Sequence, residues 1–152
     1  MQDISFRQAK SSDHEVVVDL MQELVNELDP LEDASGIKIR ISQDIQKALN
    51  SENICIFLAT REDSVIGFSR GDILFEDPIF RLRADNRCGY VDQMFVNPNY
   101  RGNKIGEKLL ALCESWFRSK GIRYSILHAA VRATRFYARS GYQSNREMFK
   151  KL

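Results

Sequence analysis

The sequence has few of the residues that build metal or disulfide sites. Its three cysteines, Cys55, Cys88 and Cys113, are odd in number and widely spaced. This arrangement fits neither a disulfide framework nor a zinc pattern. Only two histidines, His14 and His128, are present, which also disfavours a metal centre. We therefore expect a protein that works without a bound metal.

Long apolar runs and an excess of one charge are also missing. No apolar run reaches the roughly 18 residues that a bilayer-spanning helix needs. The first seven residues lack the apolar stretch of a signal peptide, so we expect a cytoplasmic protein without a membrane partner. The 22 basic residues nearly balance the 21 acidic ones, which gives no basic excess for bulk binding of nucleic acid.

The hydrophobic pattern predicts a single domain over residues 1–152, because this length suits one core. Apolar runs and alternation predict strands over 4–7, 54–59, 65–75, 89–96 and 124–129, with a closing strand over 142–152. Helical spacing predicts helices over 13–28, 42–49, 102–120 and 132–140. This order predicts a mixed α/β (α+β) domain around one sheet.

The segment 96–106 carries the most distinctive pattern, in which a strand ends, the chain turns and a helix begins beside Gly102 and Gly106. The first amides of a helix have no internal partner and carry partial positive charge. Glycine lets an anion approach them, and Arg101 and Lys104 add charge. The pattern predicts a phosphate or pyrophosphate site. The alternative is a tight turn with solvated basic residues.

Two motifs resemble those of the GNAT superfamily of N-acetyltransferases. The stretch Val96-x-Pro98-x-Tyr100-Arg101-Gly102-x-x-Ile105-Gly106 resembles motif A, whose core is Gln/Arg-x-x-Gly-x-Gly/Ala. Lys104 stands where the internal glycine is usual. Downstream, Ala133-x-x-x-Tyr137-x-x-x-Gly141-Tyr142 resembles motif B, with Ala130 in place of the usual asparagine.

The resemblance implies the GNAT fold, a central mixed sheet flanked by helices in which the parallel strands 89–96 and 124–129 splay apart. It also implies that acetyl-CoA (coenzyme A) binds between these strands. The pantetheine arm is then expected on the backbone of Met94, Phe95 and Val96. The pyrophosphate is expected on Arg101, Gly102, Asn103, Lys104, Ile105 and Gly106.

The implied activity is transfer of an acetyl group directly to a primary amine of a small molecule or peptide. Asp92 is our candidate for the base that deprotonates the amine, although it also fits a surface acid or a partner for an arginine. Tyr137 is our candidate for the acid that protonates the leaving thiolate, or else an aromatic core residue. Glu76 and Asp77 are expected either to recognise the substrate or to be solvated.

Two other functions remain open from the sequence. The departures at Lys104 and Ala130 are compatible with a non-catalytic acyl-CoA-binding or regulatory domain. A nucleic-acid protein would instead use the basic cluster Arg132, Arg135, Arg139 and Arg146, which the balanced charge disfavours. An acidic run favours a cationic acceptor or is simply solvated; it comprises Glu27, Asp29, Glu32 and Asp33. The resemblance also makes a homodimer possible.

Overall fold

The apolar segments of the sequence form five strands in the computed structural model, which describes residues 3–28, 36–75, 86–144 and 150–151. The elements in chain order are β1 (Ile4–Gln8), η1 (Ser11–Asp13), α1 (His14–Glu27), α2 (Ile37–Leu49), β2 (Ile54–Arg61), β3 (Ser64–Leu74), β4 (Cys88–Val96), η2 (Pro98–Tyr100), α3 (Ile105–Ser119), β5 (Ser125–Leu127), η3 (Val131–Ala133) and α4 (Thr134–Arg139).

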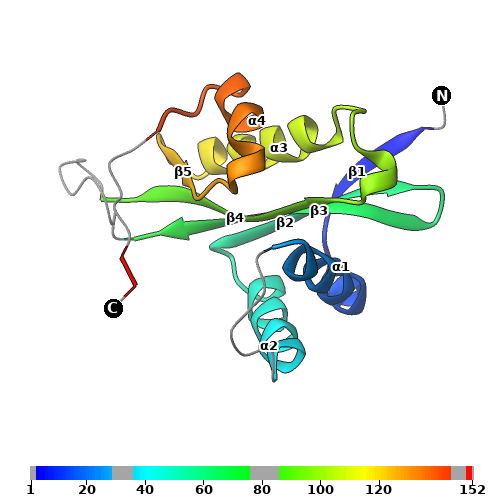
Figure 1. Cartoon of the computed structure of the whole chain (residues 1–152). Helices are drawn as coiled ribbons and strands as arrows, with labels where there is room; N and C mark the ends of the chain where they lie inside the picture. Colours follow the sequence, from blue (N-terminus) through cyan, green and yellow to red (C-terminus); the bar gives the residue numbers. More distant parts are fainter. Residues whose placement is uncertain (1–2, 29–35, 76–85, 145–149, 152) are drawn as a thin grey trace.

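The five strands make one mixed sheet in the order β1-β2-β3-β4-β5. The first four are antiparallel neighbours, whereas β5 runs parallel to β4. Helices α1 and α2 cover one face of the sheet, and α3 and α4 lie on the other (Figure 1). This arrangement confirms the predicted mixed sheet flanked by helices.

The sheet has an apolar core on each face because its strands alternate their side chains between the two. On the α1 and α2 face, helix residues such as Val17 and Ile45 pack against Leu58, Phe68 and Phe95. On the α3 face, the buried residues form two clusters; they are Cys55, Ile73, Val91, Leu110, Cys113, Phe117, Ile122, Ala59, Ile66, Ile105 and Leu109.

Two glycines let α3 approach the sheet closely. A Cβ atom at Gly89 would lie 2.5 Å from the ring of Phe117, and one at Gly71 would lie 2.7 Å from it. Real side chains cannot occupy that space, so the ring of Phe117 fills a notch in β3 and β4. The notch fixes where α3 crosses the sheet and therefore where its first turn lies.

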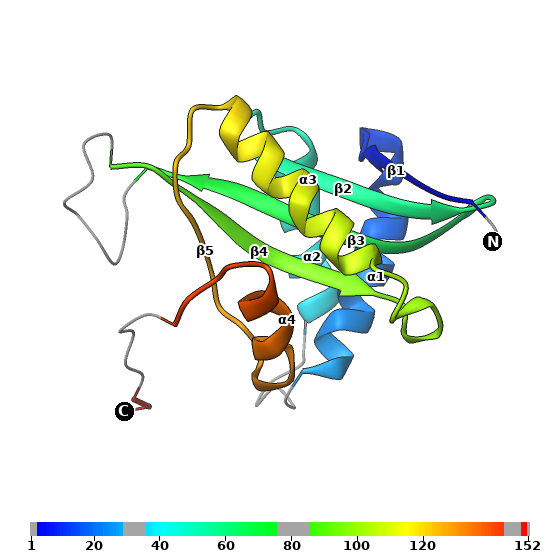
Figure 2. The same cartoon turned by 90° about the horizontal axis from the view of Figure 1, so that it is seen from above.

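Strands β4 and β5 stay together over only three residue pairs, Gly89 with Ser125, Tyr90 with Ile126 and Val91 with Leu127. The next residue of β4, Asp92, is an extra residue in its ladder with β3, which is a β-bulge. Bulges increase local twist and bend a strand. Beyond this point the two strands diverge (Figure 2), which confirms the predicted splay, although β5 is shorter than expected.

Two helix starts differ from the sequence prediction. Helix α2 begins at Ile37, five residues before the predicted start, because Gly36 turns the chain with φ +69°. Helix α3 begins at Ile105, later than predicted, because Gly102 and Lys104 have φ values of +81° and +59°. Left-handed residues cannot belong to a right-handed helix.

Several predicted features fall partly or wholly outside the described residues. Glu76 and Asp77 lie outside them, as do residues 145–149 of the predicted closing strand. The described parts of that segment, 142–144 and 150–151, are not in a strand. Among the described helices, none is long and apolar enough to cross a membrane. The described residues contain no group of three or more histidine, cysteine, aspartate or glutamate side chains that could hold a metal ion.

Candidate active site

The turn between β4 and α3 forms a cradle of backbone amides. The first intrahelical bond at this end is donated by Lys108 to the carbonyl of Lys104, at 3.1 Å. The amides that precede it, from Lys104 to Glu107, have no partner of that kind, as at any helix start. The cradle therefore presents donors, partial positive charge and the Lys104 ammonium together, as a phosphate requires.

Side-chain amides hold this turn in shape. Asn97 accepts a hydrogen bond from the amide of Asn99 at 3.0 Å. The side chain of Asn103 donates to the carbonyls of Tyr100 and Arg101 at 3.0 and 3.3 Å. These local bonds fix the backbone before any ligand arrives. Asn103 thus supports the cradle with its side chain, a role that sequence spacing did not suggest.

Gly106 brings the two predicted motifs into contact. A Cβ atom at Gly106 would lie 3.3 Å from the ring of Phe136 in α4. Such a distance is tighter than normal side-chain packing, so glycine allows α4 to lie against the first turn of α3. The two segments that carry the motifs are therefore neighbours around one opening.

The second half of β4 has an edge that faces the divergence. Residues 93–96 pair with β3 but with no residue of β5. The side chains of Met94 and Val96 pack toward α3, and Phe95 packs toward α1. The backbone groups on the β5 side remain available to an extended ligand, which can add like a strand. This is where the pantetheine contacts were predicted.

Asp92 lies at the bulge, on the face that α2 covers. Its side chain is 26% exposed, and its Oδ2 accepts a hydrogen bond from Gln93 Nε2 at 2.6 Å. Arg70 Nε lies 3.6 Å from the same oxygen. Burial raises the pKa of Asp92 above its ordinary value; Arg70 opposes this rise, whereas Asp72 and Asp44 add to it.

Arg70 is buried and its charge is already used. It donates to both carboxylate oxygens of Asp72, at 2.7 and 2.8 Å, and it also pairs with Asp44 of α2. The side chain of Arg70 is 5% exposed, so it could not remain charged without these partners. This group was not predicted from the sequence, although two charged residues inside an otherwise buried strand are a signal for it.

Tyr137 lies on the opposite face of the sheet. Its ring packs into the cluster that contains Val91 and Leu110, beside Met94 and Leu127 where the strands part. Burial raises the pKa of its hydroxyl. The group is therefore protonated at neutral pH. The predicted base and the predicted acid thus flank the opening from its two sides.

The guanidinium of Arg101 points toward α1. It donates to the carbonyl of Val96 at 2.8 Å, lies over the ring of Phe95 and pairs with Glu27 at 2.6 Å. The same carboxylate pairs with Arg132 at 2.9 Å. Of the acidic run noted in the sequence, the charge of Glu27 is thus already paired. Its other members, Asp29, Glu32 and Asp33, lie outside the described residues.

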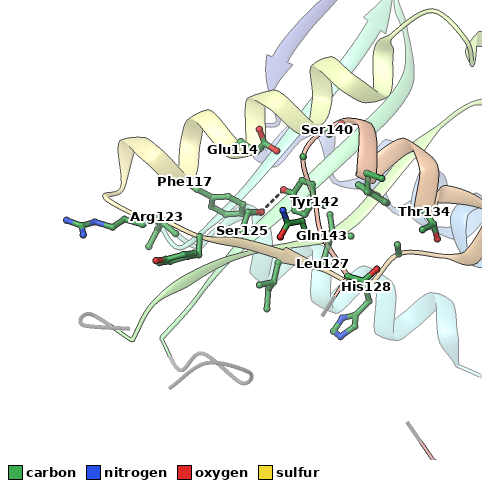
Figure 3. Close-up of a pocket in the computed structure, with 18 of the residues that line it drawn as sticks. Glu114, Phe117, Arg123, Ser125, Leu127, His128, Thr134, Ser140, Tyr142 and Gln143 are labelled. Atoms are coloured by element: carbon green, nitrogen blue, oxygen red, sulfur yellow. Dashed lines mark hydrogen bonds between the residues drawn. The ribbon is translucent and has the colours of Figure 1, made fainter. Parts of the chain in front are cut away.

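A separate hollow of about 880 Å³ lies beyond β5, between α3 and the segment that follows α4. Figure 3 shows its lining, with the hydrogen bond between Ser125 and Tyr142 at 2.7 Å crossing it. Of the predicted site residues that the structure describes, only Tyr137 lines it. The hollow therefore does not include the amide cradle or the free edge of β4. His128, which also lines it, is hydrogen-bonded to Tyr90 at 2.9 Å.

Comparison with known proteins agrees with this geometry. The family described as "Acetyltransferase (GNAT) family" matches residues 18–142. An aminoalkylphosphonate N-acetyltransferase of Salmonella typhimurium is 31% identical over 95% of this chain and 88% of its own length. A spermine/spermidine N(1)-acetyltransferase of Bacillus subtilis is 26% identical over 76% of this chain and 84% of its own length.

Solved structures share the fold. A predicted acetyltransferase of Clostridium acetobutylicum, crystallised with acetyl-CoA, superposes with a TM-score of 0.86 and 19% identity. The match covers 99% of this chain and 96% of the other.

The left-handed backbone at Lys104 leads to a test of stability. A non-glycine residue in this conformation costs roughly 1–2 kcal/mol. We expect Lys104→Gly to be more stable than Lys104→Ala by about 1 kcal/mol, because both lose the charge and only glycine relieves the strain. Chemical denaturation of the two variants measures this difference. Equal unfolding free energies would show that the cradle does not hold residue 104 in this conformation.

Proposed function

Since the chain belongs to the acetyltransferase (GNAT) family, it is an N-acetyltransferase with acetyl-CoA as its co-substrate, and we propose that it acetylates a small cationic amine by direct transfer. In this proposal Asp92 is the base and Tyr137 is the acid. One observation carries it: β4 and β5 diverge between these two residues, beside the amide cradle.

The residues present fit acetyl-CoA. The amides at the start of α3 and the charge of Lys104 suit its pyrophosphate, and the free edge of Met94, Phe95 and Val96 suits its pantetheine amides. When bound, acetyl-CoA supplies a thioester, whose acetyl group passes to the amine while coenzyme A leaves as the free thiol. An amide of β4 near Met94 or Phe95 would stabilise the charge on the acyl oxygen.

Asp92 suits the task of a base. An amine is protonated at neutral pH and must lose a proton before it can attack. A carboxylate whose pKa is raised by burial holds a proton more readily than an exposed one. Gln93 and Arg70 engage Oδ2, and among the described residues no partner of Oδ1 is found, which leaves Oδ1 for the proton.

Tyr137 suits the opposite task. Its hydroxyl keeps its proton because burial disfavours the phenolate, so it has a proton to give to a thiolate. Its place on the α3 face, across the sheet from Asp92, separates the entering amine from the leaving thiol. The amine nitrogen adds to the acyl carbon and the thiolate then leaves that carbon, so the base acts at the nitrogen and the acid acts at the sulfur.

The acceptor class is argued from charge on the α2 face. Among the described residues, Asp44, Asp72 and Asp92 surround a single cation, Arg70, so this group carries an excess of negative charge. Gln93 Oε1 is buried there and accepts no hydrogen bond within the described residues, so an ammonium group would satisfy it. A phosphonate would find no free cation in this group. The charge therefore favours a polyamine, as in the Bacillus relative's name, over an aminoalkylphosphonate.

The acid role predicts the effect of Tyr137→Phe. We expect kcat to fall about 100-fold, because the proton donor is lost while the ring still packs. Tyr142→Phe is the matched control, since it removes a hydroxyl from a neighbouring ring and breaks the bond to Ser125. It should cost about 1 kcal/mol of stability and leave kcat nearly unchanged. If Tyr137→Phe keeps full activity, the protein has no such acid or is only a binder of acyl-CoA.

The base role predicts opposite effects of Asp92→Asn on activity and stability. We expect kcat/KM for the amine to fall by about 100-fold or more. The pKa of Asp92 is lower in the unfolded chain than in the folded protein. The free energy of unfolding therefore falls as pH rises through the raised folded-state pKa, because the ionised carboxylate destabilises the folded state. Asp92→Asn should therefore unfold at an equal or higher temperature at neutral pH. A variant that is active but less stable would mark Asp92 as a structural partner of Arg70.

The pH profile of the wild-type enzyme offers a further check on the same base. Its rate should fall on the acidic side with an apparent pKa above the ordinary aspartate value, and Asp92→Asn should remove that limb.

The acceptor class predicts a preference that a thiol-release assay can measure. Spermidine should have a kcat/KM at least about tenfold above that of 2-aminoethylphosphonate, which corresponds to one additional ion pair of about 1.4 kcal/mol. Asp44→Asn should narrow this ratio, because Asp44 is the most exposed carboxylate of the group. The control Glu23→Asn removes an exposed charge from α1 and should leave the ratio unchanged. A preference for the phosphonate would overturn the assignment.

A further inference from the structure

One carboxylate joins the two segments that follow the diverging strands. Glu27 is the last residue of α1, and each of its carboxylate oxygens pairs with a different arginine. Oε1 lies 2.6 Å from Nη2 of Arg101, in the cradle that follows β4. Oε2 lies 2.9 Å from Nη2 of Arg132, in the η3 turn that follows β5. The link therefore spans the divergence on the α1 face.

The link is anchored firmly on the β4 side. Arg101 also donates through Nε to the carbonyl of Val96, and its guanidinium lies over the ring of Phe95. Three contacts thus fix the orientation of this planar group, which leaves it little freedom to move. Glu27 is 22% exposed, less than either arginine, so water screens its two ion pairs only in part.

The β5 side has fewer restraints of its own. No residue of η3 or α4 is buried, and Val131 is 95% exposed. The contacts of α4 with the rest of the domain include Phe136 against Gly106 and the ring of Tyr137 in the apolar cluster. The ion pair between Arg132 and Glu27 lies just before α4, so we expect it to contribute strongly to the position of η3 and α4.

We propose that Glu27 is a positioning residue for the transferase reaction. By holding Arg132 to Arg101 it sets the width of the opening between the segments that follow β4 and β5, and hence the affinity for acetyl-CoA. It also fixes the approach of α4, which carries Tyr137. The inference rests on the proposed function in one respect only: it takes this opening as the place where acetyl-CoA binds.

The test compares Glu27→Gln with Glu23→Gln, which removes an exposed charge one turn earlier on the same helix. Binding of acetyl-CoA is measured by calorimetry, and KM and kcat are measured separately. We expect Glu27→Gln to raise the Kd and KM for acetyl-CoA about fivefold, consistent with the loss of two partly screened ion pairs, and to change kcat less. Glu23→Gln should change none of the three.

A double variant checks the route through Arg132. Arg132→Gln alone should weaken binding as Glu27→Gln does, and the combination should be no weaker than either single variant. Losses that add fully would overturn the proposal, because they would mean that the two residues act independently. Unchanged or tighter binding in Glu27→Gln would also overturn it, as would a lower melting temperature with an unchanged Kd. Calorimetry needs no turnover, so these outcomes do not depend on the roles of Asp92 and Tyr137.

Discussion

The loss of pairing between β4 and β5 after Val91 is the constraint on which the rest of the site depends. A strand within a sheet normally satisfies its backbone on both sides, and buried amides and carbonyls without partners are costly. The bulge at Asp92 bends β4 away and leaves one side of residues 92–96 without a strand neighbour. An extended ligand with its own amides can complete that edge. The same bend lets the two segments that follow the strands stand apart around the amide cradle.

The sheet also works as a partition between two kinds of environment. On the α2 face, Asp44, Asp72 and Asp92 gather around Arg70 and give a polar, negatively charged surface. On the α3 face, Tyr137 lies among apolar side chains. In the proposed reaction the cationic acceptor suits the first environment and the thiol leaving group suits the second. The fold therefore supplies two opposite polarities a few residues apart without any long-range arrangement of charges.

Much of the fold and the turn between β4 and α3 could be predicted from the sequence, because both depend on local patterns. Apolar periodicity located the strands, and the glycines near residues 102–106 located the cradle. The start of α3 was placed too early, since only the structure shows that Lys104 adopts a left-handed conformation. The cluster around Arg70 and the bridge through Glu27 were missed for a different reason. Arg70 and Asp72 share one strand, but Asp44 lies 26 residues from Arg70. Glu27 lies 74 and 105 residues from Arg101 and Arg132, so no local pattern connects these partners.

The notch that receives Phe117 has a consequence for how the sequence can vary. Gly71, Gly89 and Phe117 share one volume, in which any added atom on the glycines would meet the ring. Gain of a side chain at one position therefore demands a smaller residue at another, and the three sites should covary among close homologues. A larger residue at Gly71 or Gly89 would be accepted only after a smaller residue had replaced Phe117. This small volume therefore limits the order in which substitutions can accumulate in α3, the helix that carries the cradle at its other end.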